Sequence, residues 1–204
     1  MSLYALDEEF RRQGFSLVGG VDEVGRGPFA GPLVACVCTF PSECTFDELN
    51  DSKKLNKTQR QRIYNALVRD PRVSFSLGLA DVATIDRLGV HKAAFFAMED
   101  AYLKMKKKPD CLLVDGPHPV GPKITAFQKP IVQGDSKSAV IAAASIIAKV
   151  RRDWIMSRMH LLYPEYGFDT NQGYGTKDHK EALEKYGPTL IHRTSFKPVQ
   201  LAMK

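Results

Sequence analysis

The chain has 204 residues, of which 44% are hydrophobic and 25% charged, and its formal net charge is +6. A chain of this length can bury its own hydrophobic core. It contains no apolar run of about 18 residues, and its N-terminus lacks the apolar segment of a secretory signal, which excludes a membrane-spanning helix and predicts a cytoplasmic protein with no membrane partner. The basic balance favours a polyanionic partner, although many basic proteins bind no nucleic acid.

The four cysteines, Cys36, Cys38, Cys44 and Cys111, form no C-x-x-C pair and have no histidine close by in the sequence. This spacing argues against a zinc site and predicts reduced thiols, some of them buried. Cys36 and Cys38 stand two residues apart in an apolar run, so we expect them to share one face of a strand.

The first predicted elements are two strands joined by a turn. Residues 16–24 and 33–40 are apolar and partly β-branched, and the segment between them, 25–32, is dense in glycine and proline, so we expect an antiparallel pair. A helix is predicted over 57–69, where apolar residues recur at helical spacing. Residues 72–80 alternate between apolar and small side chains, which predicts a strand.

The second half of the chain predicts strands and helices in alternation. Thr84 is a candidate cap for a short helix, and the other expected elements are a helix over 91–106, a strand over 111–116, a long helix over 138–160 and a helix near 178–186. This order predicts an α/β domain with a mixed sheet and helices packed on it. No linker divides the chain, so we expect one domain over 1–204, with a helical and loop-rich part from about 161.

Three carboxylates occur where predicted strands end. Asp22 and Glu23 close the first strand just before the turn, and Asp115 follows four apolar residues and precedes Gly116. Adjacent strand side chains point to opposite faces, so a bend is needed for Asp22 and Glu23 to serve one site, and a solvated strand end is the alternative. Ligands of α/β domains usually bind at the carboxyl ends of the strands, which favours Asp115 as a site residue.

A fourth carboxylate has two candidates. Asp135 precedes the long helix and could also be a cap or a turn residue. Asp153 lies inside that helix after Arg151 and Arg152, where local ion pairs explain it. Grouped carboxylates repel one another unless cations neutralise them, and their oxygens suit Mg²⁺ or Mn²⁺. Two such ions about 4 Å apart can hold a phosphodiester for in-line attack.

Several ordered segments resemble the ribonuclease HII family in sequence and spacing, over about residues 16 to 200. They are VDEVGRGPFAGP (21–32), NDSKKL (50–55), LLVDG (112–116), GDSKSAVIAAASIIAKVRRD (134–153), GYGTKDH (173–179) and HRTSF (192–196). The resemblance implies a ribonuclease H-like fold, a five-stranded mixed sheet flanked by helices. It also implies that the catalytic carboxylates and ligands of two divalent ions, Mg²⁺ or Mn²⁺, are Asp22, Glu23, Asp115 and Asp135.

The same resemblance assigns substrate contacts to the turn after the first strand. The backbone of Gly25, Arg26 and Gly27 would read the ribose 2′-OH, and Tyr174 would stack on the adjoining deoxyribose. Glycines let a backbone approach a ligand closely, and the 2′-OH distinguishes RNA from DNA. The residues alone fit equally well a plain tight turn and a half-buried loop tyrosine.

The implied phosphate contacts are Ser52 and Lys53, for which a solvated lysine is the alternative. The implied activity is an endonuclease that hydrolyses the RNA strand of RNA–DNA hybrids and cuts 5′ of ribonucleotides embedded in duplex DNA, leaving a 5′-phosphate and a 3′-OH. We expect a monomer. The sister ribonuclease HIII family is disfavoured, because its members normally carry an N-terminal domain and lack an arginine such as Arg26 in the turn.

Two other functions are compatible with parts of this pattern. A DNA junction nuclease of the same general fold would use the same carboxylates and ignore the 2′-OH. A non-catalytic nucleic-acid-binding protein would use its lysine and arginine side chains alone, but uncompensated carboxylates repel phosphates and argue against it.

Overall fold

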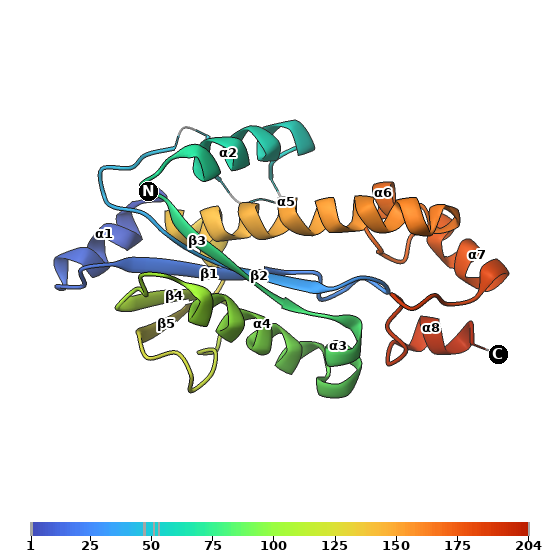
Figure 1. Cartoon of the computed structure of the whole chain (residues 1–204). Coiled ribbons are helices and arrows are strands. Elements are labelled where there is room, and N and C mark those ends of the chain that lie inside the picture. Colours follow the sequence, from blue (N-terminus) through green and yellow to red (C-terminus); the bar gives the residue numbers. More distant parts are fainter. Residues whose placement is uncertain (1, 47, 51, 53, 204) are drawn as a thin grey trace.

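The computed structural model describes residues 2–46, 48–50, 52 and 54–203, and its centre is one five-stranded mixed sheet (Figure 1). The spatial order is β3-β2-β1-β4-β5. The strands are β1 (Val18–Val24), β2 (Leu33–Thr39), β3 (Ser74–Ala80), β4 (Cys111–Asp115) and β5 (Phe127–Ile131). The first three pair antiparallel, whereas β4 is parallel to β1 and β5 to β4. The expected mixed sheet and its antiparallel first pair are confirmed.

Helices cover both faces of the sheet (Figure 1). One apolar cluster joins the sheet to α5 (Ala139–Leu162) and α2 (Lys57–Arg69), and another joins it to α4 (Val90–Lys104) and α3 (Val82–Leu88). The remaining short elements are α1 (Ala5–Arg12), η1 (Gly134–Ser136), η2 (Pro164–Tyr166), α6 (Phe168–Asn171), α7 (Lys177–Tyr186) and α8 (Lys197–Leu201). A third apolar cluster joins the far end of α5 to the C-terminal helices.

Close packing of α5 on β1 depends on Gly20. A Cβ at that residue would lie 2.3 Å from the backbone nitrogen of Ile141, so only glycine lets the helix approach this closely. The contact brings the buried first turns of α5 beside the strand that carries Asp22 and Glu23. The helix therefore contributes side chains to the same end of the sheet.

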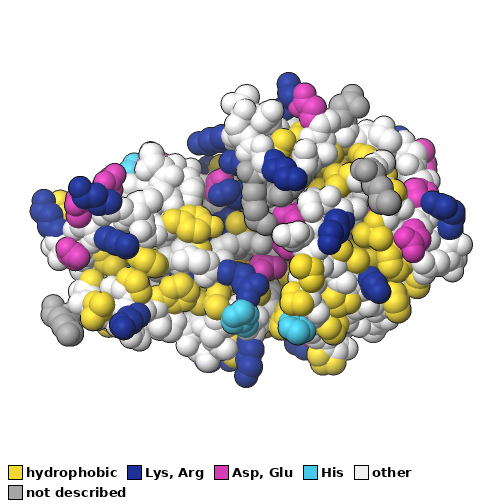
Figure 2. Space-filling model, turned by 180° about the vertical axis from the view of Figure 1, so that it is seen from behind, with side chains coloured by type: hydrophobic (Ala, Val, Ile, Leu, Met, Phe, Trp, Pro, Cys, Tyr) yellow, Lys and Arg dark blue, Asp and Glu magenta, His cyan; other side chains and the backbone are white. Residues whose placement is uncertain are grey.

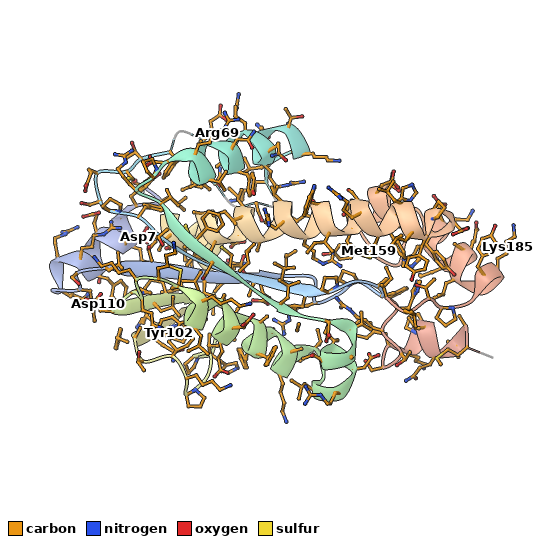
Figure 3. All side chains as sticks on the ribbon, viewed as in Figure 1. Asp7, Arg69, Tyr102, Asp110, Met159 and Lys185 are labelled. Carbon is orange, nitrogen blue, oxygen red and sulfur yellow. The ribbon has the colours of Figure 1, made fainter. Side chains whose placement is uncertain are left out.

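The start of α5 is fastened to α1 by a buried carboxylate, Asp7, which points toward it (Figure 3). Ser138 donates from Oγ to Asp7 at 2.6 Å, and the backbone of Val140 donates to it at 3.1 Å. Burial raises the pKa of Asp7 to about 6. Ser138 also accepts from the backbone of Ile141 and is the N-cap of α5, so the alternative of Asp135 as its cap is wrong.

Three local expectations need correction. The cap of α3 is Asp81, which accepts from the backbone of Thr84 at 2.8 Å, so Thr84 is not the capping residue. Neither α1 nor β5 is among the predicted elements. In β3, Leu79 on the predicted apolar face is 42% exposed, whereas Gly78 and Ala80 on the other face are buried. The small residues are buried because α4 packs directly on them: a Cβ at Gly78 would lie 1.9 Å from a backbone oxygen of that helix.

The cysteine predictions are confirmed. All four thiols are free and buried, and Cys36 and Cys38 lie in the same apolar cluster, on one face of β2. Burial raises the pKa of both thiols, so they stay protonated and behave as small apolar side chains. Within the described part of the chain, no helix is long and apolar enough to cross a membrane.

Candidate active site

A cavity of about 410 Å³ opens at the carboxyl ends of β1 and β4. Its lining brings together three of the predicted carboxylates, Asp22, Glu23 and Asp115. The other lining residues are Val24, Gly25, Arg26, Gly27, Ser52, Arg60, Ser145, Lys149 and Tyr174. On the face drawn in Figure 2, acidic side chains lie in a hollow near the centre, with Lys and Arg side chains around it.

Asp22 is the most deeply buried of the three carboxylates, with 6% of its surface exposed. Burial raises its pKa well above the usual range, and the neighbouring charges of Glu23 and Asp115 raise it further. Its oxygens accept hydrogen bonds from the Ser145 side chain and, at 2.7 Å, from the backbone of Glu23. These bonds offset only part of the cost, so the ionised form of Asp22 is destabilised in the metal-free fold.

Glu23 reaches the same cavity as Asp22 although the two are adjacent in β1. The strand ends one residue later, at the turn, and both carboxylates line the same cavity. Burial raises the pKa of Glu23, the Arg26 guanidinium at 3.2 Å lowers it, and Asp115 raises it again; the net direction is upward. Arg26 also contacts His91 at the start of α4, so its side chain is held from two sides.

Asp115 is hydrogen-bonded to the residue that precedes Asp135 in the chain. The N–H of Gly134 donates to Asp115 Oδ1 at 2.7 Å, and Asp135 is the next residue, in η1. Asp135 is 2% exposed and lies beside the cavity without being part of its lining. Its role as a ligand stays a prediction.

Asp153 lies further along α5 and faces a different groove. It forms an ion pair with Lys149 at 2.7 Å, so a local ion pair does explain it, as expected. The partner is Lys149 and not Arg152, whose guanidinium is buried elsewhere.

The carboxylates of the cavity fit divalent cations in chemistry but not in present arrangement. Among the described residues, no three His, Cys, Asp or Glu side chains are placed as a ready metal-binding group. The oxygens instead accept from the backbone of Glu23 and Gly134 or face Arg26. The donor set nevertheless suits Mg²⁺ or Mn²⁺, because hard oxygen ligands lie together in one cavity and a cation would relieve the repulsion between their charges.

The turn after β1 is held from beneath by Arg193, whose side chain is fully buried. It donates to the carbonyls of Gly25 at 2.6 Å and Arg26 at 3.1 Å. In a trans peptide the N–H points opposite to the C=O, so the N–H groups of Arg26 and Gly27 point away from Arg193, in a turn that lines the cavity. This orientation supports the predicted reading of a 2′-oxygen by the backbone.

A second buried arginine, Arg152, joins the same turn to the loop of Tyr174. It donates to the carbonyls of Ala30 at 3.1 Å and Gln172 at 2.9 Å, and its guanidinium lies 5.9 Å from the centre of the Tyr174 ring. Burial lowers the pKa of both arginines, that of Arg193 to about 9. Carbonyl oxygens, rather than carboxylates, accept their hydrogen bonds.

Gly25 could not be replaced without disturbing this arrangement. Its φ is +99°, and a Cβ would lie 2.4 Å from Nε of Arg152. Gly27 differs, because the nearest atom to a Cβ there is a ring carbon of Tyr174 at 3.7 Å, an ordinary contact. The fold therefore demands glycine at 25 but not at 27.

Two buried histidines fix the backbone of Tyr174, whose own side chain is 40% exposed. His179 donates from Nδ1 to the Tyr174 carbonyl at 2.9 Å, so its Nε2 must accept from Nε2 of His192 at 3.1 Å. Nδ1 of His192 accepts from the backbone of Thr189 at 2.9 Å, which agrees with that tautomer. Burial lowers the pKa of both rings, that of His192 to about 4, so the pair is neutral near pH 7.

Ser52 lies in the cavity lining but is only 7% exposed. Its hydroxyl is 2.9 Å from that of Ser145, which in turn bonds Asp22. The hydroxyl is thus engaged in the network behind the carboxylates, and a phosphate contact from Ser52 stays a prediction. Lys53, the other expected phosphate ligand, lies outside the described residues.

Several site residues were not singled out by the sequence analysis. Ser145, Lys149 and Arg60 line the cavity, and Arg193 with the two histidines supports it. A usable signal exists for Ser145, the one polar residue within 139–148 of the long helix. Arginine and histidine in polar segments carry no comparable signal, because they are usually solvated.

Known proteins share this fold. The ribonuclease H2 of Pyrococcus horikoshii superposes with a TM-score of 0.79 at 26% identity, over 92% of this chain and 97% of that one. A Bst ribonuclease HIII solved with Mn²⁺ superposes with a TM-score of 0.74 at 17% identity, over 92% of this chain and 69% of that one, a likeness of fold alone. The sheet and its helices are therefore a ribonuclease H-like fold, as expected.

Sequence comparison then defines the family. The model of the family described as ribonuclease HII matches residues 19–199. The ribonuclease HII of Chlamydia pneumoniae is 47% identical over 203 residues, covering 98% of this chain and 92% of that protein. The ribonuclease HII of Chlamydia abortus is 48% identical over 200 residues, covering 98% and 93%. The chain belongs to the ribonuclease HII family and is an enzyme of the nuclease class.

Proposed function

We propose that this enzyme hydrolyses the RNA strand of RNA–DNA hybrids and also cuts 5′ of ribonucleotides embedded in duplex DNA, leaving a 5′-phosphate and a 3′-OH. Family membership supports the action on hybrids. The observation that carries the finer proposal is that the carboxylates, the glycine turn and Tyr174 line one cavity. A cytoplasmic, monomeric enzyme is part of the same proposal.

The carboxylates would hold two divalent ions, with Asp22 shared between them, Glu23 and Asp115 completing one site and Asp135 the other. Bound there, such ions supply activation of a water and stabilisation of the leaving 3′-oxygen. No side-chain nucleophile is required. The positive charges of Arg60 and Lys149 in the same cavity suit the phosphates on either side of the cut.

The turn after β1 and Tyr174 would recognise the sugars on the two sides of the ribonucleotide–deoxyribonucleotide step. The N–H groups of Arg26 and Gly27 point away from Arg193, in a turn that lines the cavity, and would donate to a 2′-oxygen, while the partly exposed ring of Tyr174 would stack on the next sugar. Arg193 and the His179–His192 pair hold these groups in place by their carbonyls. Together they would read the step from a ribonucleotide to a deoxyribonucleotide.

A cleavage assay on three substrates tests this proposal. The substrates are an RNA–DNA hybrid, a DNA duplex with one embedded ribonucleotide, and an all-DNA junction. We expect cleavage of the first two and none of the third. Cleavage of the junction would instead establish a junction nuclease, and binding without cleavage of any substrate would establish a non-catalytic protein.

Replacing Tyr174 with alanine should alter substrate preference. Loss of one stacking contact should lower kcat/KM for the embedded ribonucleotide, by an amount that corresponds to about 1–3 kcal/mol of transition-state stabilisation. A long hybrid should suffer less, because the next sugar there is a ribose. The measurement is kcat/KM of both enzymes on both substrates. Equal losses would mean that Tyr174 supports general binding or the fold, and that the sugar is read elsewhere.

Replacing Gly27 with alanine should separate recognition from folding. The fold has room for this Cβ, so the melting temperature should stay near that of the wild type, whereas a ribose approaching the turn would meet the new methyl group. Loss of one hydrogen bond to the 2′-oxygen predicts about tenfold lower kcat/KM on the embedded ribonucleotide. Gly25→Ala is the contrasting variant and should be unstable. Unimpaired cleavage by Gly27→Ala would remove the turn from ribose recognition.

A further inference from the structure

A second groove, of about 320 Å³, runs between α2 and α5 and neighbours the active-site cavity, since Arg60 lines both. Its other lining residues are Lys57, Gln61, Tyr64, Val150, Arg151, Asp153, Trp154 and Ser157. Figure 1 shows the two helices side by side on one face of the sheet. Apart from Arg60, none of these lining residues takes part in the reaction described above.

The exposed indole of Trp154, on α5, contacts the guanidinium groups of Arg151 and Arg158. Trp154 is 53% exposed, and the guanidinium carbons of Arg151 and Arg158 lie 5.5 and 4.7 Å from the centre of its ring. The three residues follow one another at spacings of three and four, so they form a ridge on one side of the helix. Arg151 also donates from Nη1 to the Tyr64 hydroxyl at 3.4 Å, and cation–π contact with the indole restrains both guanidinium groups. The remaining N–H donors of the two groups suit phosphate.

The charge of the groove is complementary to a polyanion. Lys57, Arg60 and Arg151 contribute three positive charges to the lining. The carboxylate among the described lining residues, Asp153, is already paired with Lys149 at 2.7 Å. A protein partner with an acidic face would need this charge as well, but the shared residue Arg60 favours the nucleic-acid substrate proposed for the neighbouring cavity.

The ridge lies further along α5 than the active-site cavity, at a distance that a short duplex can span. Ser145 lines the active-site cavity and Trp154 follows nine residues later, which is about 13 Å of helix. At 3.4 Å per base pair this corresponds to about four base pairs. A duplex seated over the carboxylates is long enough to reach the groove.

We propose that the groove between α2 and α5 binds the sugar–phosphate backbone of the substrate duplex about four base pairs from the cut, with Trp154 holding Arg151 and Arg158 as a phosphate clamp. The inference rests on the proposed function for the position of the duplex. It adds a binding site that lies outside the catalytic cavity.

The first test uses an all-DNA duplex and needs no cleavage. The double variant Arg151→Gln with Arg158→Gln is compared with a control that removes two positive charges from the exposed loop between α4 and β4, Lys106→Gln with Lys107→Gln. Binding is followed by fluorescence anisotropy over a range of salt concentrations. Loss of two phosphate contacts should flatten the slope of log affinity against log salt by about 1.8, and the control should leave the slope near that of the wild type. An unchanged slope, or equal flattening in the control, would overturn the proposal.

The second test places the contact on the substrate. One duplex has a single embedded ribonucleotide and long flanks on both sides. Two further duplexes have one flank, upstream or downstream of the ribonucleotide, shortened to about two base pairs. The double variant should lose about tenfold in kcat/KM on long flanks, and little when the flank over the groove is missing. Trp154→Ala should reproduce part of this loss in kcat/KM. Trp154→Phe, which keeps an aromatic ring, should retain kcat/KM near the wild-type value. Equal losses on every duplex would show a general charge effect and refute the clamp. A wild type that cleaves none of them would refute the proposed function instead, leaving the groove to be judged by the salt slope.

Discussion

Asp22→Asn should abolish cleavage and, without divalent ions, raise the melting temperature. The carboxylate is buried between Glu23 and Asp115, and burial and repulsion raise its pKa well above 3.8. A group whose pKa is raised in the folded state favours folding when protonated, and that contribution is lost as pH rises from the unfolded pKa through the folded one. Above the unfolded pKa the buried carboxyl therefore opposes folding, and asparagine removes this cost while keeping the shape.

The loss of activity should be large, because a shared metal ligand lowers the activation free energy by several kcal/mol. Its removal should therefore slow cleavage by about 10³-fold. Asp115→Asn should behave alike, since its amide oxygen can still accept from the backbone of Gly134. The measurements are single-turnover cleavage and thermal unfolding in chelator. Normal cleavage by either variant would remove that carboxylate from the active site.

Asp153 provides the control for the fourth carboxylate. Its ion pair with Lys149 lies on the border of the second groove, so Asp153→Asn should lose much less activity than Asp135→Asn. Both variants remove one negative charge near the start or middle of the same helix, which makes them a fair comparison. The reverse order of losses would make Asp153 the fourth ligand.

Chelation should have an effect of similar size. Activity should vanish in EDTA and return with Mg²⁺ or Mn²⁺, because the clustered carboxylates repel the phosphodiester unless cations neutralise them. A second measurement does not depend on activity: ions that bind only the folded state raise its melting temperature. The wild type should show this rise and Asp22→Asn should show little of it. Full activity in chelator would exclude metal-dependent catalysis.

Much of the fold follows from local pattern, and the misses have physical reasons. The strand–turn–strand and the main helices are visible because apolar spacing matches their geometry. The edge strand β5 is short and contains Pro130, which suits only an edge and weakens the strand pattern. Helix α1 was missed because one of its buried side chains is a carboxylate, Asp7, whose partners lie more than 130 residues away.

The site divides in the same way. The three carboxylates of the cavity could be predicted because strand ends are where such domains bind ligands. Arg193 could not, because its role depends on the carbonyl of Gly25, 168 residues distant in the sequence. The tautomers of His179 and His192 likewise follow from a chain of contacts that only the folded protein assembles.

Anomalous diffraction from crystals soaked in Mn²⁺ tests the central claim most directly, namely that the acidic cavity holds two ions. With substrate bound to a slowed variant such as Asp135→Asn, the site of Asp22, Glu23 and Asp115 should keep its peak and the second peak should weaken. In the wild type with a non-cleavable duplex, we expect two peaks about 4 Å apart. Asp22 should lie within about 2.2 Å of both, Glu23 and Asp115 beside one and Asp135 beside the other. No peak in the cavity, or peaks that Asp22 does not contact, would contradict the account.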